Sequence, residues 1–413
     1  MPAEKFNILK SAAMFENAEY QSRPIAKALK VMRFSIPALF FGVALLATAA
    51  PQPSPQFFQV PVFSAGQDGY HTYRIPSLIV TRTGDLLAFA EGRRHGAGDA
   101  GDIDLVLKRS QDGGRTWSPL QIVWDHSTNT CGNPCPVLER ESGRILLLMT
   151  WNRGEDREPQ IINQTSKDTR RVYLSHSDDN GRTWAAPREI TASVKRPDWT
   201  WYATGPGAGI QLEKGPNRGR LVIPCDHIEA ASKRYYSHVI YSDDRGETWH
   251  IGGRTPQPGV NECEVVELSD GRLMLNMRNY TRSQPTRQVA FSADGGITWT
   301  GQKHVPELIE PICQASIRRL SWPTADLPGI LLFSNPASTN RRERLTIRAS
   351  ADDGETWPWS RMLDSRPAAY SCLAALPDGQ AAVLYETGDK NPYQSIVFAR
   401  FNIEWLKNTQ PLQ

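Results

Sequence analysis

The sequence offers little that would build a metal centre or a nucleic-acid-binding surface. None of its six cysteines pairs at zinc-ribbon spacing, and its eight histidines are scattered along the chain. The 47 basic and 44 acidic residues leave a net charge of only +3, far from the basic balance of a nucleic-acid-binding domain. We therefore expect no catalytic metal, no other cofactor and no nucleic-acid partner. The slight positive charge would not hinder an anionic substrate.

Sustained helical periodicity and long apolar runs are also missing after residue 56. Short strand-like runs alternate there with Gly, Pro and Asn turns, as at 77–80, 144–148, 220–223, 272–275 and 381–385. Strands at regular spacing between turn signals are typical of an all-β sandwich, barrel or propeller. Because no linker or shift in composition interrupts it, we predict one domain over residues 57–405, with a C-terminal tail at 406–413.

One short apolar run lies near the N-terminus. Met32-Arg33 precedes the apolar residues 34–46, which are followed by Ala47-Thr48-Ala49-Ala50 and a Pro-rich spacer at 51–56. A basic flank, a short apolar core and small residues are typical of a secretory signal peptide. We predict an N-terminal extension and signal over residues 1–50, with Met32 as an alternative start, and a secreted or periplasmic body. An uncleaved anchor is the alternative, and no other stable membrane insertion is expected.

The most conspicuous pattern that is present is an octamer, Ser-x-Asp-x-Gly-x-Thr-Trp, repeated five times. The copies begin at residues 110, 177, 242, 292 and 350, each after a strand-like run. Asp and Gly favour tight turns, so each copy predicts a hairpin whose Ser and Asp bond turn N–H groups and whose Trp covers the tip. The five aspartates could be read as metal ligands or acid–base groups. A unit that recurs along a repeat protein is more often structural than functional. We therefore assign the five copies no catalytic or metal-binding role.

The spacing of the octamers, roughly 50 residues or somewhat more, predicts a propeller or another repeat array. Five repeats plus a strand-rich start and end, at four antiparallel strands per blade, predict a six-bladed β-propeller. The segment 57–88 and the chain after Leu363 are expected to share the blade that lacks a copy. Cys131 and Cys135 are close enough for a small disulfide in an oxidising compartment, whereas the other four cysteines fit buried thiols.

Three arginines outside the octamers interrupt apolar strands. Arg74 lies in Tyr73-Arg-Ile-Pro-Ser-Leu78, Arg278 follows Leu275-Asn-Met, and Arg342 follows Ser334-Asn-Pro-Ala-Ser-Thr-Asn-Arg341. Burying an arginine is costly without a partner, so structural ion pairs are one explanation. The other is that strand ends of three blades converge on one carboxylate, which the guanidinium fork binds bidentately. Arg341 stays open as an alternative to Arg342.

Acidic candidates lie on a loop and on a strand. Asp99 is on a Gly-rich loop directly after a strand, where it could reach over a bound sugar, and Arg93 at the base of that loop could touch a sugar hydroxyl. An ordinary turn is the alternative, and Asp102 lies close enough to replace Asp99. Glu262 and Glu264 share one face of a strand, so spacing does not choose between them.

Two further candidates lie near the C-terminus. Tyr370 begins a strand in Ala368-Ala-Tyr-Ser-Cys-Leu373, and Glu386 follows Leu384-Tyr385. A tyrosine in such a position is usually part of the core, so local pattern alone does not give Tyr370 a catalytic role.

The region from about residue 57 to 405 resembles the sialidase (neuraminidase) family. The octamers match that family's Asp-box, or BNR repeat, and Tyr73-Arg-Ile-Pro76 matches its Phe/Tyr-Arg-Ile-Pro signature. The resemblance implies a role for seven residues that occur in family order: Arg74, Arg278 and Arg342 as a carboxylate-binding triad, Asp99 as acid/base, Glu262 as activator of the nucleophile, Tyr370 as nucleophile and Glu386 as support for Arg74.

The resemblance further implies an exo-α-sialidase that removes terminal α-linked sialic acid from glycoproteins, gangliosides and oligosaccharides. Retention of configuration and a tyrosyl–enzyme intermediate are implied as well, and we expect a monomer. A neutral tyrosine suits this substrate, because a carboxylate nucleophile about 4 Å from the substrate carboxylate would be repelled by roughly 4 kcal/mol at an effective dielectric near 20. The alternatives are a non-catalytic sialoglycan-binding propeller and a trans-sialidase that uses the same residues.

Overall fold

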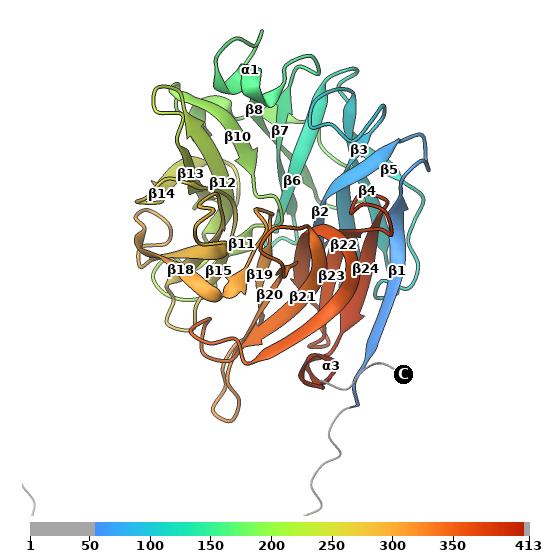
Figure 1. Ribbon diagram of the computed structural model, residues 1–413, viewed down its shortest axis with the longest axis vertical. Helices are drawn as coiled ribbons and strands as arrows, with labels where there is room; N and C mark the ends of the chain where they lie inside the picture. Colours follow the sequence, from blue (N-terminus) through green and yellow to red (C-terminus); the bar gives the residue numbers. More distant parts are fainter. Residues whose placement is uncertain (1–53, 409–413) are drawn as a thin grey trace, which may run out of the picture. The chain divides into compact units, whose positions relative to one another are not determined.

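The computed structural model describes residues 54–408, which are almost entirely β-structure (Figure 1). The helices of this part are short: α1 (Glu158–Ile162), α2 (Thr191–Val194) and α3 (Ile403–Lys407). Across residues 54–408 none of them has the length and apolar character needed to cross a membrane. The predicted signal segment, 1–50, lies outside the described residues. The all-β prediction is confirmed.

The strands follow one another in antiparallel groups of four. The first group holds β2 (Thr72–Val80), β3 (Leu86–Arg93), β4 (Ile103–Ser110) and β5 (Gln121–Trp124), and the second β6 (Thr130–Leu138), β7 (Ile145–Asn152), β8 (Arg171–Ser177) and β9 (Arg188–Glu189). A parallel pair, Ile103 with Thr130, joins the two. The third group contains β10 (Trp199–Thr204), β12 (Leu221–Glu229), β13 (Tyr235–Ser242) and β14 (His250–Arg254). The short strand β11 (Ile210–Gln211) pairs with β12 as well. The fourth contains β15 (Val260–Glu267), β16 (Leu273–Asn279), β17 (Thr286–Ser292) and β18 (Thr300–Ile309).

One long strand, β22 (Trp359–Ala375), belongs to two such groups. Its first part, to Pro367, pairs with β21 (Glu343–Ser350), which continues into β20 (Ile330–Pro336) and β19 (Ser316–Ser321). Its second part pairs with β23 (Ala381–Thr387), which continues into β24 (Ser395–Phe401) and β1 (Phe57–Ser64). The two ends of the described chain therefore meet in one sheet, with blue β1 beside red β24 (Figure 1).

The pairing of β1 corrects the predicted division of residues 57–88. Only β1 joins the C-terminal strands, whereas β2 pairs with β3, and β3 pairs in turn with β4. The reason is local: the turn between β2 and β3 holds its two strands as a hairpin, and a short connection keeps neighbours in sequence together in the sheet.

Each octamer forms a turn between two antiparallel strands, as predicted, and in every group that contains an octamer these are the third and fourth strands. In the third copy, Ser242 Oγ donates to Asp244 Oδ1 over 2.8 Å and accepts from Gly246 N over 2.8 Å. Thr248 donates to Asp244 through its backbone N at 2.9 Å and its Oγ1 at 2.5 Å. Gly246 has a φ of +92°, which glycine adopts without strain. Trp249 is buried over the turn, so serine, aspartate and tryptophan have the predicted structural roles.

Asp244→Ala should lower the free energy of unfolding by about 1–2 kcal/mol, because it removes the acceptor of several turn hydrogen bonds. The activity per folded molecule should stay unchanged, since Asp244 lies outside the pocket described below. Urea unfolding with parallel assays of the folded protein measures both quantities. The exposed Glu247→Ala in the same turn serves as the control, and a loss of activity without loss of stability in Asp244→Ala would contradict the structural role.

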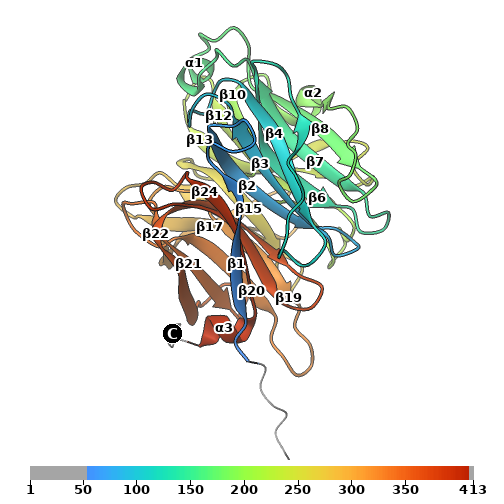
Figure 2. The same ribbon diagram turned by 90° about the vertical axis from the view of Figure 1, so that its right-hand side faces the viewer.

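Two further predictions need correction. Cys131 and Cys135 are free thiols. They do not pair because they pack in different hydrophobic clusters, Cys131 with Leu105 and Cys135 with Val137. The predicted tail at 406–413 begins too early, since α3 continues to Lys407 and buries Leu406. Trp405 stacks on Phe57 with ring centroids 4.8 Å apart, so α3 packs beside the start of β1 (Figure 2).

The first strands of most successive groups lie next to one another. Strand β2 contacts β6 and β22, β6 contacts β10, β15 contacts β19, and β19 contacts β22. Residues at the ends of these strands therefore come together although they are far apart in the sequence.

Candidate active site

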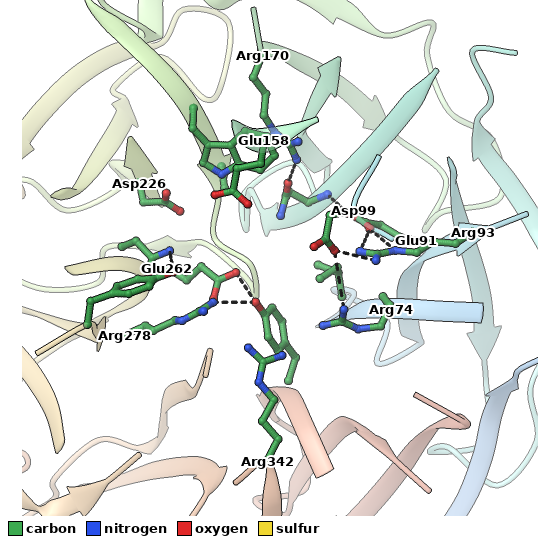
Figure 3. Close-up of a pocket in the computed structure, with 17 residues that line it drawn as sticks. Arg74, Glu91, Arg93, Asp99, Glu158, Arg170, Asp226, Glu262, Arg278 and Arg342 are labelled. Carbon is green, nitrogen blue, oxygen red and sulfur yellow. Dashed lines mark hydrogen bonds and ion pairs between the residues drawn. The ribbon is translucent and has the colours of Figure 1, made fainter. Parts of the chain in front are cut away.

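A charged pocket of about 150 Å³ opens where these strand ends meet (Figure 3). Its lining includes seven of the eight predicted site residues: Arg74, Arg93, Asp99, Glu262, Arg278, Arg342 and Tyr370. The eighth, Glu386, is bonded to Arg74 behind the pocket wall. The structure thus brings together every residue that the sequence singled out for the site.

Glu386 anchors two sides of the pocket. It is fully buried on β23 and accepts from Arg74 Nε at 2.7 Å, Ile75 N at 2.9 Å and Tyr370 N at 3.0 Å. A register shift after Arg74 and a φ of +60° at Ile75 turn the backbone of β2 at this point. A positive φ is strained for a β-branched residue, so the Glu386 bonds hold the backbone in an uncommon conformation next to Arg74.

The three arginines converge around Tyr370. Arg278 Nη1 donates to the Tyr370 hydroxyl over 3.1 Å, and the Cζ atoms of Arg74 and Arg342 lie 5.1 and 5.5 Å from the centroid of its ring. Arg342 also donates to the Tyr393 hydroxyl over 3.0 Å. Its neighbour Arg341 is exposed and does not line the pocket, which places Arg342 and not Arg341 in the cluster.

Tyr370 and Glu262 form a short hydrogen bond. The tyrosine hydroxyl donates to Glu262 Oε1 over 2.5 Å, and Arg278 Nη1 donates to Glu262 Oε2 over 2.5 Å. Burial raises the pKa of Tyr370 well above its usual value, Glu262 raises it further, and the three arginines oppose that rise. The tyrosine is therefore neutral and points its proton at a carboxylate. This pair is the combination that a tyrosine nucleophile requires.

Glu264 has a different environment from Glu262. It is fully buried, is absent from the pocket lining, and accepts from Ser316 Oγ at 2.7 Å and Ile317 N at 2.9 Å. Burial raises the pKa of Glu264 to about 7. Glu262 is therefore the hydrogen-bond partner of Tyr370, whereas the spacing of the sequence did not distinguish it from Glu264.

Asp99 reaches the pocket from its loop and is paired with arginine. Its side chain is 65% exposed, and its Oδ1 lies 2.7 Å from Arg93 Nη1 and 3.9 Å from Arg74 Nη1. Loss of hydration among the surrounding pocket residues would raise the pKa of Asp99, but the charges of Arg93 and Arg74 outweigh this effect and hold the pKa below its usual value. Asp102 instead pairs with Arg94, at 3.3 Å, and is absent from the pocket lining.

The sequence pattern did not single out the other polar and aromatic residues that line the pocket, among them Glu91, Asn133, Glu158, Arg170, Trp201, Asp226, Asn261 and Tyr280. Asp226 had a usable signal, because it is a charged residue at the end of the apolar run Leu221–Cys225, as Arg278 is in its strand. Glu158 and Arg170 lie in or beside the charged connection after β7, where nothing in the local pattern indicates a site. Only the folding of that connection over the pocket brings them in.

The sequence of this chain is similar to a known repeat family and to known sialidases. Residues 84–383 match the family model described as a BNR repeat-like domain. The chain is 37% identical to a sialidase of Micromonospora viridifaciens, over 87% of this chain and 56% of that protein. It is 31% identical to an exo-alpha-sialidase of Aspergillus fumigatus, over 92% of this chain and 99% of that protein. This chain belongs to the sialidase family.

Solved structures of sialidases share the fold of this family member. A Hadza microbial sialidase superposes with a TM-score of 0.76 at 33% identity, over 84% of this chain and 69% of that chain. A Trypanosoma rangeli sialidase with 2,3-difluorosialic acid, described as a covalent intermediate, gives a TM-score of 0.68 at 22% identity, over 84% of this chain and 58% of that chain. The second likeness concerns the fold alone.

Proposed function

We propose that this sialidase-family protein is an exo-α-sialidase. It would hydrolyse terminal α-linked sialic acids on glycoproteins, gangliosides and oligosaccharides, with retention, through a tyrosyl–enzyme intermediate. The observation that carries the proposal is the 2.5 Å hydrogen bond from Tyr370 to Glu262 inside a cluster of three arginines. The relation to an exo-alpha-sialidase along almost the whole of that protein's length supports the same activity.

The arginine cluster would bind and orient the substrate carboxylate. Arg74, Arg278 and Arg342 approach from three different strand groups, so a carboxylate between them meets guanidinium groups on several sides. Because Glu386 and Glu262 already pair with Arg74 and Arg278, the positive charges are held in place before substrate binds. This preorganisation would fix the anomeric carbon next to Tyr370.

The chemistry would then proceed in two displacements. The Tyr370 oxygen attacks the anomeric carbon and passes its proton to Glu262, while the bond to the leaving oxygen breaks and Asp99 protonates that oxygen. In the second step Asp99 takes a proton from water, whose oxygen attacks the same carbon. The bond to Tyr370 breaks, and the tyrosine recovers its proton from Glu262. Two inversions give net retention.

Asp99 must carry a proton in the first step, although Arg93 and Arg74 lower its pKa in the structure without substrate. A substrate carboxylate would neutralise part of the Arg74 charge and place a negative charge near Asp99. Both effects raise a carboxyl pKa, so substrate binding itself would favour the acid form of Asp99.

We also propose that the fold is a six-bladed propeller. The first four groups of strands, together with the two groups that share β22, support six antiparallel units. The pairing of β1 with β24 would close the ring of units, because it joins the start of the described chain to its last sheet.

Hydrolysis can be tested directly with a fluorogenic aryl α-sialoside. We expect release of the aryl group, with α-configured sialic acid as the first product in a proton NMR time course. Absence of release would contradict the enzyme and favour the sialoglycan-binding alternative, and a β-configured first product would contradict retention. Adding lactose separates the trans-sialidase alternative, which would form sialyllactose.

Export and the monomeric state are proposals that rest on the sequence. The basic, apolar and small-residue pattern of residues 32–50 supports a signal peptide. Fractionation of cells expressing the full chain, followed by N-terminal sequencing and light scattering of the purified protein, tests export, cleavage and oligomeric state. Retention in the cytoplasm would contradict the signal.

A further inference from the structure

Another buried ion pair lies outside the lining of the pocket. Arg287 on β17 and Glu310, which directly follows β18, are 0% and 1% exposed, and Arg287 Nη1 lies 2.8 Å from Glu310 Oε2. Neither residue lines the pocket. A buried ion pair adds little net stability, because the lost hydration of both charges offsets their attraction. The role of this pair is therefore sought in the groups that it bonds.

Glu310 holds the backbone next to Arg278. Its Oε1 accepts a hydrogen bond from Asn279 N over 2.5 Å. Asn279 is the last residue of β16 and directly follows Arg278. The guanidinium of Arg278 in turn donates to Glu262 and to the Tyr370 hydroxyl. A buried side chain from another part of the chain therefore fixes the main chain of a pocket arginine.

Arg287 ties the same strand to the connection between β18 and β19. Its Nε donates to Asn276 Oδ1 over 2.7 Å, two residues before Arg278 on β16. Its Nη1 donates to the carbonyl oxygen of Cys313 over 2.8 Å, within the connection. The planar guanidinium fork can bond several groups at once in a fixed geometry, which the single ammonium of a lysine cannot reproduce. Arg287 thus sets the spacing between β16 and the connection.

That connection supports Arg342 and Tyr370. The carbonyl oxygen of Ile312 accepts from Arg342 Nη2 over 3.2 Å. Ile312 has a φ of +56°, which is uncommon for a β-branched residue and persists only where the surroundings hold the backbone. Cys313, the next residue, packs in the same apolar cluster as Tyr370. The position of the connection therefore affects a second pocket arginine and the tyrosine.

Gln314 completes this support. Its Nε2 donates to the carbonyl oxygen of Ser371 over 2.9 Å, and its Oε1 accepts from Ser371 N over 3.0 Å. One side-chain amide thus bonds both backbone groups of the residue that follows Tyr370. Within the five residues 310–314, the connection contacts the immediate surroundings of Arg278, Arg342 and Tyr370.

We propose that Arg287 and Glu310 are positioning residues that set the placement of Arg278 relative to Arg342 at the substrate carboxylate. The pair touches neither the substrate nor the reacting atoms, and it acts through the backbone of β16 and the connection 310–314. The inference rests on the proposed function, because it takes a carboxylate as the group that these arginines bind.

Glu310→Gln and Asp353→Asn form a matched pair of variants. Each turns the carboxylate partner of an arginine into an amide, since Asp353 Oδ1 lies 2.5 Å from Arg319 Nη2. Asp353 and Arg319 also lie outside the pocket lining. An amide has a single acceptor oxygen, so Glu310→Gln loses its bond to either Arg287 or Asn279, whichever way the amide is oriented.

Binding of an unreactive ligand reports on the arginines without the chemical step. The ligand is 2,3-didehydro-2-deoxy sialic acid, and its C1 carboxamide, which has no negative charge, is the comparison. Titration calorimetry gives the dissociation constants, and ligand NMR gives the weak ones. We expect the wild type to bind the acid at least about tenfold more tightly than the carboxamide, because charge-assisted hydrogen bonds are the stronger ones.

Glu310→Gln should raise the Kd of the acid about tenfold and leave that of the carboxamide within about twofold of the wild type. It should lower kcat/KM for an aryl α-sialoside by about 10- to 100-fold, because misplacing a binding group by about 1 Å can cost about 100-fold. Asp353→Asn should leave all three quantities within about twofold. Urea unfolding shows that each variant is folded under the assay conditions.

A merely structural pair would lower the urea midpoint without changing the preference for the acid. Equal rises of both dissociation constants, or wild-type binding of the acid by folded Glu310→Gln, would therefore overturn the inference. Should Glu310→Gln fail to fold, Arg287→Lys keeps the charge without the fork and should show the same selective loss. A wild type that binds the acid no more tightly than the carboxamide would instead overturn the proposed function.

Discussion

Tyr370→Phe should reduce release of sialic acid from an aryl α-sialoside by roughly 10³-fold or more, because it removes the attacking oxygen and leaves the aromatic ring in place. The lost hydroxyl donates to Glu262 at 2.5 Å and accepts from Arg278 at 3.1 Å. Arg278 and Glu262 remain paired with each other after the substitution, so the arginine cluster should keep its shape. Thermal unfolding should therefore change little while kcat falls.

Formation of the covalent bond to Tyr370 can be tested separately from the rate of sialic acid release. Incubation with 2,3-difluorosialic acid, followed by proteolysis and mass spectrometry, should place the sugar on the peptide that contains Tyr370. The Tyr370→Phe protein should give no such adduct, and Tyr385→Phe, a buried tyrosine outside the pocket, provides the matched control. An adduct on another residue, or undiminished release by Tyr370→Phe, would show that a different group is the nucleophile.

Glu386→Ala should lower the free energy of unfolding by about 3–5 kcal/mol, because removal of one partner of a buried pair leaves the other charge unpaired. Arg74 would lose its 2.7 Å partner, and the backbone N–H groups of Ile75 and Tyr370 would lose their acceptor. We expect kcat/KM to fall by at least about 100-fold as well, since the carboxylate-binding arginine and the nucleophile share this anchor.

The Glu386→Gln variant removes the negative charge of residue 386 but keeps the size of its side chain, so it distinguishes the effect of the charge from that of the side-chain shape. It keeps acceptors for Arg74 and Ile75 but turns one oxygen that faces Tyr370 N into an amide, so its losses should be smaller than those of Glu386→Ala. Glu355→Ala, an exposed octamer residue, should change stability by less than about 0.5 kcal/mol. Urea unfolding and steady-state kinetics measure both effects. Wild-type stability in Glu386→Ala would show that Arg74 does not depend on this ion pair.

The sequence by itself determined the strands and the turns of this protein. The octamers predicted where hairpins form, because Ser, Asp, Gly and Thr make their turn hydrogen bonds within one short stretch of chain, as between Ser242 and Thr248. Charged residues in apolar strands, such as Arg74 and Arg278, were visible as exceptions to the strand pattern. The resemblance to the sialidase family then assigned these separated residues to one substrate-binding site, which their local sequence patterns did not indicate.

Only the tertiary structure decided which of these groups meet. Glu262 and Glu264 are equivalent by spacing, yet one bonds Tyr370 and the other is enclosed with Ser316. Arg287 and Glu310 are separate charges in the sequence, and only the fold pairs them beside the segments that hold Arg278 and Arg342. The physical reason is that a turn is stabilised by neighbours in sequence, whereas a pocket is made by strand ends brought together from distant parts of the chain.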